Sequence, residues 1–295
     1  MPSSIPGSGI EGNAMTTITF PMRRIARRHP GLALGAAILA ALCLLALCAQ
    51  LVTPVDPGFV DMSQRAKPPS WDHIFGTDML GRDLFARIIY GGRLSLSIGV
   101  AVALIATVAG TVIGLVAGYV RLADAILMRI MDGVMSIPSV LLAVALMALS
   151  TGSIGNVIVA ISISGVPRIA RLVRGSVLSL REAVFVEAVI GGGVGTGRII
   201  FRHILPNAAA PIIVNATYLC AGAMLSEAVL CFIGAGTPPT VPSWGNIMAE
   251  GRTLWMVKPH IVAFPALILS IAILAVNMVG DGLRDMLDPR AGRRN

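Results

Sequence analysis

The chain has 295 residues, of which 55% are hydrophobic and 13% are charged. Soluble domains carry about 25% charged residues, so this composition excludes an ordinary soluble protein and indicates an integral membrane protein. The formal net charge is +8, but the basic residues lie between apolar runs rather than on one soluble surface. This placement indicates membrane orientation and contact with membrane lipid, and it gives no sign of nucleic-acid binding.

The N-terminal part combines a polar tail with the first apolar run. Residues 1–22 are rich in Ser, Gly, Pro and Thr, and we expect them to form a disordered cytoplasmic tail. The uncharged run that follows the first arginines is longer than the apolar core of a signal peptide, and no clear cleavage site follows it. We therefore expect an uncleaved first span at about 31–52, and we group it with an extracytoplasmic segment as a unit over 23–93.

The extracytoplasmic segment contains a charge cluster just before the second apolar run. Arg82, Asp83 and Arg87 are spaced so that we expect them to pair on one short amphipathic helix at the membrane surface. Two roles stay open for this cluster. It contacts a transported ligand, or it is a solvated group of charges that only caps the next span.

The second span is expected at about 94–119 and opens a core of five membrane helices over 94–290. It contains Gly110, Gly114 and Gly118 at four-residue spacing. Small residues at this spacing let the backbone of another helix approach closely, so we expect the three glycines to face a neighbouring helix rather than lipid.

The third and fourth spans are expected at about 133–150 and 154–170. Charged residues between Arg121 and Asp132 mark a short cytoplasmic segment before the third span. Pro138 near its start is interpreted as an ordinary first-turn proline in preference to a kink beside a pathway. The basic residues after the fourth span are expected to anchor its exit in lipid headgroups. They are Arg168, Arg171 and Arg174.

The segment 181–206 separates the fourth and fifth spans. It begins with helix-favouring residues, is interrupted by glycines, and resumes as RIIFRHIL before Pro206. Glycine costs about 1 kcal/mol in a helix interior, so the glycines predict a turn with unusual backbone angles between two short helices. They are Gly191, Gly192, Gly193, Gly195 and Gly197.

The fifth span, at about 207–230, contains the carboxylate of Glu227 near its outer end, and the sixth is expected at about 261–280. A carboxylate in an apolar run is costly, so Glu227 is expected to turn inward and take a hydrogen bond, or to line the outer part of a pathway. An interfacial Glu that reaches water is an equal alternative. Our hypothesis is a packing role at an outer gate rather than direct ligand recognition.

Orientation and chemistry are constrained by the basic residues. Most of them fall before the first span, within 168–202 or after the last span, so the positive-inside rule places both termini and the segment 181–206 in the cytoplasm. Neither lysine, Lys67 or Lys258, lies in a nucleotide-binding P-loop. The histidines and cysteines show no metal-ligand spacing. The sequence therefore predicts no catalytic residue, no metal site and no cofactor in this chain.

The segment 181–206 resembles the EAA loop of ABC-transporter permeases. Three further stretches, HIFGTDMLGRDLFARIIYGGRLSL, FIGAGTPPTVPSWGNIMAEGR and NMVGDGLRDMLDPR, resemble the C-type permeases of oligopeptide, dipeptide and nickel importers. The residues that match the loop pattern are Glu187, Ala188, Gly193, Leu205 and Pro206, whereas Val189 and His203 depart from it.

The resemblance implies a type I ABC importer permease, an all-α inner-membrane protein with six transmembrane helices. It also implies that the loop forms a cytoplasmic helical hairpin that docks in an ATPase subunit. The implied partners are a second homologous permease, two ATPase domains that bind ATP and Mg, and an extracytoplasmic substrate-binding protein. Di- and oligopeptides are the commonest cargo of this branch, with nickel, glutathione or another small solute as alternatives.

Two other classes were weighed against an importer subunit. An ATP-independent carrier or channel is expected to place ionisable residues at membrane depth, and in the sequence only Glu227 approaches that description. An intramembrane enzyme is expected to bring together a serine–histidine or paired-aspartate arrangement, and none is visible. Both classes are therefore disfavoured.

Overall fold

The computed structural model describes residues 29–149 and 152–287, and every regular element in those ranges is a helix. The predicted all-α membrane fold is confirmed. By length and composition, five helices are able to cross a membrane, and a sixth crossing results if one bent pair of helices is counted as a single span. The predicted tail over 1–22, its following arginines and the residues after 287 lie outside the described ranges.

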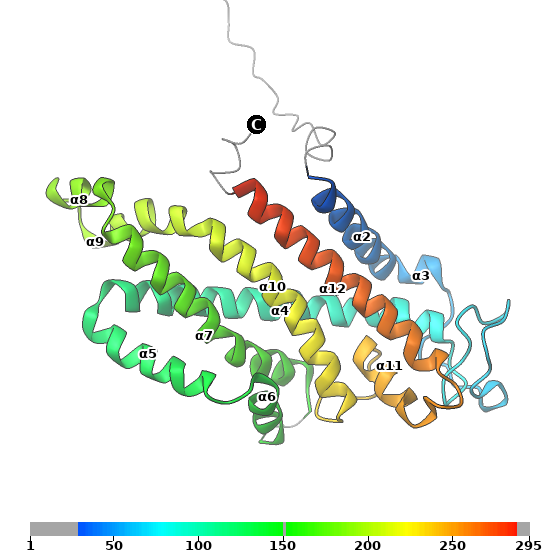
Figure 1. Cartoon of the computed structure of the whole chain (residues 1–295). Coiled ribbons are helices and arrows are strands. Elements are labelled where there is room, and N and C mark those ends of the chain that lie inside the picture. The colour runs from blue at the N-terminus through cyan, green and yellow to red at the C-terminus, as the bar shows by residue number, and fades with distance from the viewer. Residues whose placement is uncertain (1–28, 150–151, 288–295) are drawn as a thin grey trace, which may run out of the picture.

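Five long helices form the body of the protein (Figure 1). Three of them run side by side, the first helix packs along the last, and α4 crosses α7 and α10. The long helices are α2 (Pro30–Leu47), α4 (Leu84–Tyr119), α7 (Ile154–Arg181), α10 (Leu205–Phe232) and α12 (His260–Leu287). The short elements are α3 (Ala49–Val52), η1 (Met62–Gln64), α5 (Arg121–Met135), α6 (Ser139–Ala148), α8 (Val184–Gly191), α9 (Thr196–Ile199), η2 (Ile200–Ile204), α11 (Trp244–Gly251) and η3 (Arg252–Leu254).

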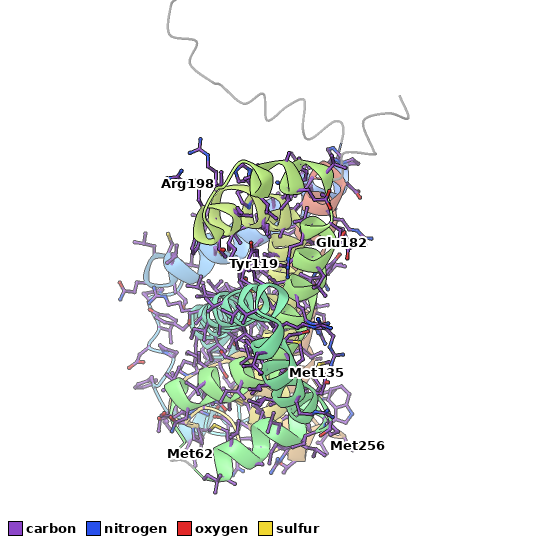
Figure 2. All side chains as sticks on the ribbon, turned by 90° about the vertical axis from the view of Figure 1, so that its left-hand side faces the viewer. Met62, Tyr119, Met135, Glu182, Arg198 and Met256 are labelled. Atoms are coloured by element: carbon purple, nitrogen blue, oxygen red, sulfur yellow. The ribbon has the colours of Figure 1, made fainter. Side chains whose placement is uncertain are left out.

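The molecule has two distinct ends. One end, called here the α8 end, carries α8 and α9 together with the start of α2 and the last turns of α12 (Figure 1). The opposite end, called the α11 end, carries α6 and α11. Figure 2 shows the same division, with Arg198 and Glu182 at the α8 end and Met62 and Met256 at the other.

The most extensive helix packing joins α4 to α7. A Cβ added to Gly110, Gly114 or Gly118 would lie only 2.6 Å from atoms of α7. Real side chains do not approach so closely, so the two backbones come together at these positions only because no side chain intervenes. Ile169, Val173 and Val177 on α7 occupy the space that the glycines leave.

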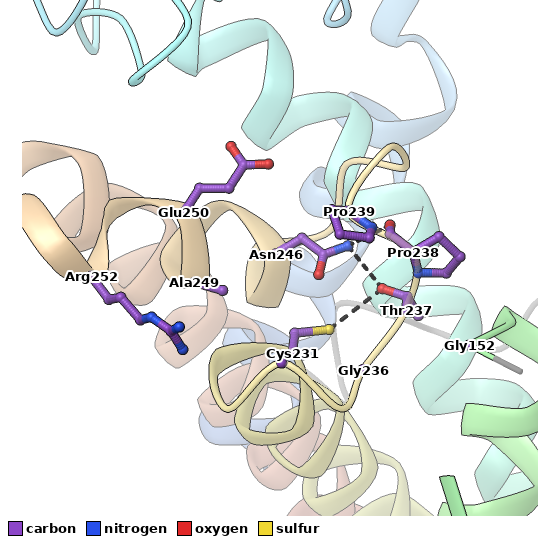
Figure 3. Close-up of a pocket in the computed structure, with 11 residues that line it drawn as sticks. Gly152, Cys231, Gly236, Thr237, Pro238, Pro239, Asn246, Ala249, Glu250 and Arg252 are labelled. Carbon is purple, nitrogen blue, oxygen red and sulfur yellow. Dashed lines mark hydrogen bonds between the residues drawn. The ribbon is translucent and has the colours of Figure 1, made fainter. Parts of the chain in front are cut away.

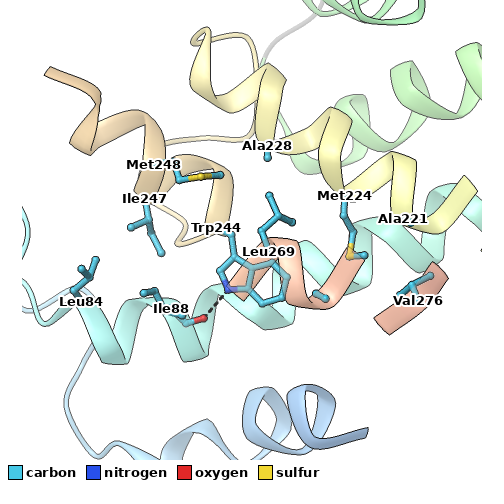
Figure 4. Packing of buried hydrophobic residues seen from close by; sticks show 11 residues of the cluster. Leu84, Ile88, Ala221, Met224, Ala228, Trp244, Ile247, Met248, Leu269 and Val276 are labelled. Atoms are coloured by element: carbon cyan, nitrogen blue, oxygen red, sulfur yellow. Dashed lines mark hydrogen bonds between the residues drawn. The ribbon is translucent and has the colours of Figure 1, made fainter. Parts of the chain in front are cut away.

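A second core holds α11 against α4, α10 and α12 (Figure 4). The buried Trp244 donates a hydrogen bond from its indole N–H to the carbonyl of Ile88, at 2.9 Å, and it packs with Met224 and Leu269. Ser243 caps α11 by accepting a hydrogen bond from the backbone N–H of Asn246. No helix is predicted between the fifth and sixth spans, because a helix of 8 residues is too short for a hydropathy signal.

Two predicted spans lie within longer helices. The second helix begins at Leu84 rather than at 94, because Asp83 accepts a hydrogen bond from the N–H of Ala86 and starts the helix there. The fourth continues to Arg181 rather than ending near 170. The three arginines that were expected to anchor its exit from the membrane therefore lie within α7.

The third predicted span is not a single helix. Instead of one helix over 133–150, the chain forms α5 and α6, which meet at an angle of 88°. Pro138 is the N-cap of α6, where it cannot donate a backbone hydrogen bond and disfavours helical geometry at Ile137. The charged stretch that was expected to be a cytoplasmic segment is helix α5 itself.

Candidate functional site

The loop between α7 and α10 turns at a Schellman motif, a helix end closed by two backbone hydrogen bonds. The N–H of Gly193 donates to the carbonyl of Ile190 at 2.9 Å, and that of Val194 donates to Val189 at 3.4 Å. Gly193 has φ +74°, a backbone conformation that favours glycine. The other four glycines of the loop have no positive φ, so the prediction of unusual backbone angles holds for Gly193 alone.

Buried side chains fix this loop to the body of the protein. Val186, Ile199 and Ile204 are buried in one cluster with residues of α4, α7 and α10. Arg181 adds a polar attachment, since it donates to the carbonyl of Gly118 at 3.1 Å and lies over the ring of Tyr119. The turn is therefore held in a defined position relative to α4 and α7.

The outer surface of the loop is unusually apolar. Val184 is 81% exposed and Phe201 is 70% exposed, and Phe185 and Ile190 are also exposed. Exposed apolar patches of this kind mark contact surfaces for another protein or for a membrane. We call these four residues the loop patch.

The residues selected by the loop pattern lie around this patch. Glu187 and Ala188 are exposed on α8, one turn or less from Phe185 and Ile190, and Gly193 makes the turn. Leu205 is half-buried and Pro206 exposed at the start of α10. Glu187, Ala188 and Gly193 thus lie together on one hairpin, whereas Leu205 and Pro206 lie at its base.

The second helix of the loop does not end at Pro206. Helices α9 and α10 are joined through the π-helical segment η2, so that helical structure runs without interruption from Thr196 to Phe232. Proline has no N–H to donate, and the wider π turn with the Asn207 side chain, which donates to the carbonyl of His203 at 2.6 Å, accommodates this loss.

At the α11 end, four charged side chains form a mostly buried cluster. Asp78 and Arg87 are almost completely buried, and Arg82 and Glu250 are largely so. Arg82 Nε donates to Asp78 at 2.6 Å, Arg87 Nη2 donates to Glu250 at 3.0 Å, and each arginine also contacts the other carboxylate. We call these four residues the charge cluster.

The predicted pairing of Arg82, Asp83 and Arg87 on one surface helix is wrong. Asp83 instead caps α4 and lies 2.8 Å from Nδ1 of His73, while both arginines pair with Asp78 and Glu250. The alternative of a solvated cluster is also wrong, because Arg87 is buried. Sequence reasoning missed Glu250, which lies far away in the chain and carries no local signal of its role.

A tight turn shapes the start of the charge cluster. Gly81 has φ +76°, and a Cβ there would collide with the carbonyl oxygen of Asp61. The turn lets Asp78 accept the backbone N–H groups of Leu80 and Arg82, at 2.8 and 3.0 Å. Nearby, two hydrogen bonds from Ser63 hold the pKa of the Asp61 carboxyl below its usual value.

Glu227 is buried inside the protein and does not reach water. Its carboxylate lies 3.1 Å from the sulfur of Cys231 and 3.5 Å from the hydroxyl of Ser95. Ser95 in turn accepts the backbone N–H of Trp244 at 3.1 Å. Glu227 is thus connected through one hydroxyl to the first residue of α11.

A pocket lies beside α11 (Figure 3). Its volume is about 420 Å³, and Gly152, Thr237, Asn246, Glu250 and Arg252 are among its lining residues. Asn246 donates to the hydroxyl of Thr237 at 3.0 Å, and Cys231 lies 3.4 Å from that oxygen. Within the described ranges, no group of His, Cys, Asp and Glu residues is arranged to hold a metal ion.

Comparison with known proteins identifies the family. Residues 110–293 match the family model described as the binding-protein-dependent transport system inner membrane component. The chain belongs to this family. The permease is 49% identical over 276 residues to a probable peptide ABC transporter permease of Sinorhizobium fredii, covering 94% of each chain.

Two further relatives of the permease have related names. The dipeptide transport system permease protein DppC of Alkalihalophilus pseudofirmus is 44% identical, over 87% of this chain and 84% of the relative. The glutathione transport system permease protein GsiD of Pectobacterium atrosepticum is 39% identical, over 91% and 89%. This chain is therefore a multi-pass inner-membrane permease subunit of an importer, and its family is a transport component rather than a catalytic one.

The fold agrees with a solved transporter. An inward-facing structure of the MetNI methionine ABC transporter matches the permease with a TM-score of 0.58 and 18% identity. The match covers 70% of this chain and 98% of the other. This similarity supports the predicted type I importer fold, and at this identity it says nothing about cargo.

Proposed function

We propose that this permease forms half of the translocation pathway of an ATP-driven importer for di- and oligopeptides. The observation that supports this cargo is the sequence identity of the chain with relatives named as peptide and dipeptide permeases, at 49% and 44%. A second homologous permease supplies the other half of the pathway. A substrate-binding protein delivers the peptide, and two ATPase domains bind and hydrolyse ATP with Mg.

The loop patch and its turn are the proposed docking site for an ATPase subunit. Its exposed apolar side chains on a rigidly held hairpin support this role, as does the matching spacing of Glu187, Ala188 and Gly193. Leu205 and Pro206 set the direction in which α10 leaves the hairpin. The hairpin transmits ATPase movements to the membrane helices.

The α8 end is proposed to face the cytoplasm, and the α11 end the extracytoplasmic side. The distribution of basic residues supports this orientation. It gives both chain termini a cytoplasmic position, since the start of α2 packs beside the end of α12 at the α8 end, where Leu32 lies against Gly282. Glu227 then lies near the outer side, where its buried carboxylate packs α10 against α4 and α11 as part of an outer gate.

Glutathione is a second candidate cargo, favoured by the relative that is 39% identical. To test the proposals, the permease is purified with the products of neighbouring genes and reconstituted in vesicles. ATPase activity and uptake are then measured with the binding protein loaded with dipeptides, oligopeptides, glutathione or Ni²⁺.

We expect peptides to stimulate both ATPase activity and uptake. Stimulation by glutathione or Ni²⁺ alone would overturn the cargo assignment and leave the importer assignment in place. Uptake that needs no ATP would overturn the importer mechanism in favour of a carrier or channel.

A further inference from the structure

Two adjacent helices present polar stripes on their exposed surfaces. On α5, Arg129, Asp132, Gly133 and Ser136 are exposed and follow the spacing of one helix face. On α7, Arg168, Arg171 and Gly175 do the same. An ion pair between Arg171 and Asp132, at 2.7 Å, joins the stripes into one surface. We call this surface the polar strip.

The polar strip lies at the depth of the membrane. Helix α7 has 28 residues and is about 42 Å long, whereas the hydrocarbon core of a bilayer is about 30 Å thick. Arg168 and Arg171 lie near the middle of that helix, well away from both ends. Helix α5 starts beside Tyr119 and runs to Met135, which lies closer to the α11 end (Figure 2), so it passes through the same depth.

The exposed surface of α4 has a different composition. Along the middle of α4, every exposed residue is apolar: Val100, Leu104, Ile105, Val108, Val112 and Val116. By contrast, the side chains of Asp132 and Arg171 are 61% and 51% exposed. Charges at membrane depth face the interior of a bundle or a water-filled cavity rather than lipid. The polar strip therefore faces water or another protein.

The charge of the strip distinguishes these two surroundings. Asp132 is balanced by Arg171, but within the described ranges neither Arg129 nor Arg168 makes an ion pair. A dry interface with a second permease would bury two guanidinium groups with no carboxylate from this chain, which is costly. A water-filled pathway leaves them hydrated and gives the strip an excess of positive charge.

We propose that the polar strip lines the water-filled pathway and attracts the carboxylate of the passing ligand. The proposal rests on the proposed function in one respect, namely that the ligand is a peptide with a free C-terminal carboxylate. A guanidinium group presents a planar fork of donors that suits a carboxylate. Arg129 and Arg168 are the groups free to do so, whereas Arg171 is paired with Asp132.

Cysteine labelling tests the aqueous exposure of the strip in the assembled transporter. Gly133→Cys and Gly175→Cys place a thiol on the strip, and a Cβ at either glycine meets no atom within 4 Å, so packing is preserved. Val108→Cys on the apolar exposed side of α4 is the control. Membranes are treated with anionic or cationic methanethiosulfonate reagents that do not cross lipid, and the labelled peptide is identified by mass spectrometry.

We expect both strip cysteines to react while the Val108→Cys control does not. The anionic reagent should be favoured over the cationic one on the order of tenfold, as the field of nearby guanidinium groups predicts. Adding Arg168→Gln to Gly175→Cys should remove most of this preference, whereas Arg168→Lys should keep it. No reaction at either strip cysteine would mean that protein or lipid covers the strip, and equal rates for the two reagents would mean that it attracts no anion. Either result overturns the proposal.

A second measurement tests the ligand group. Uptake of a dipeptide is compared with uptake of the same dipeptide carrying a C-terminal amide, in the original permease and in an Arg129→Gln/Arg168→Gln double variant. Because the binding protein is the same in both, any change in the acid-to-amide ratio reports on the permease. We expect that ratio to fall at least severalfold, and an unchanged ratio would overturn the carboxylate assignment. The labelling result needs no ligand, so it stands or fails independently of whether peptides are the cargo.

Discussion

Arg87 of α4 and Glu250 of α11 are joined by two hydrogen bonds, one from each terminal nitrogen of the guanidinium group to a separate carboxylate oxygen. The arginine is almost completely buried, and it also contacts Asp78. This arrangement ties the segment before α4, the start of α4 and α11 into one unit. It also makes Arg87 depend on partners from two other parts of the chain.

Removing one member of this pair should destabilise the assembled permease. Breaking a buried ion pair costs about 3–5 kcal/mol, because the remaining charge is left without its partner. We expect Glu250→Leu to lower the midpoint of thermal unfolding of the purified complex clearly, and the Arg87→Leu/Glu250→Leu double variant to be less damaging than the sum of the two single changes. The exposed Asp72→Ala in the same segment is the control. Strictly additive effects would show that the pair is not coupled.

Gly193→Val should uncouple transport from ATP hydrolysis. A residue other than glycine in the left-handed region costs about 1–2 kcal/mol, and a β-branched side chain is the least suited to it. Uptake and ATPase activity are measured in vesicles with equal amounts of inserted protein. We expect uptake to be lost while ATPase activity persists, Gly193→Asn to retain much of the uptake, and Gly191→Ala to behave as the original permease, since Gly191 is helical and has open space around it. Unchanged uptake by Gly193→Val would count decisively against the docking role.

Gly114→Leu should reduce the yield of assembled transporter. A Cβ at this position would lie 2.6 Å from Val173 and from the backbone of Ala170, so α4 and α7 would have to separate. Val112→Leu enlarges a side chain on the exposed surface of the same turn and should leave the yield unchanged. The measurement is the amount of complex recovered per unit of membrane. Equal yields from the two variants would contradict a packing role for Gly114.

Glu227→Gln should retain most uptake, whereas Glu227→Leu should lose assembly or transport. Glutamine keeps the shape of the side chain and can still bond with Ser95 and Cys231, while leucine leaves that hydroxyl without its partner in a buried site. Uptake, complex yield and basal ATPase activity are measured for both variants. If Glu227→Gln abolishes uptake while assembly and ATPase activity are intact, the charge itself is required and the packing interpretation is wrong.

The sequence predicted the spans best where long uncharged runs have clear limits. The predicted fifth and sixth spans, 207–230 and 261–280, fall within Leu205–Phe232 and His260–Leu287. Hydropathy does not predict the limits of a helix where the helix contains charged residues whose ion-pair partners lie elsewhere in the chain. Arg87 was placed outside the membrane helix because Glu250, which neutralises it, is distant in the chain.

The same limit explains the errors at α5 and α7. The pair between Asp124 and Arg174, with a hydrogen bond of 2.7 Å, stabilises charges on two helices that a local window reads as polar segments. The loop turn was easier to predict, because the requirement of Gly193 for a positive φ is a local property of the backbone. The sequence alone does not show which other glycines need a positive φ. The other four glycines of the loop do not have one.

The uninterrupted helical run from Thr196 to Phe232 has a mechanical consequence. A helix is stiff along its axis, so a tilt imposed on the hairpin at one end must reappear at the other, where Glu227 and Cys231 meet Ser95 and Thr237, unless it is absorbed on the way. This run has two irregular steps, the π turn at Ile200–Ile204 and Pro211, which has no N–H to donate to the preceding turn of the helix. Both steps lie in the half of the run that is nearer the hairpin, so their stiffness sets how much of a movement of the hairpin reaches α11.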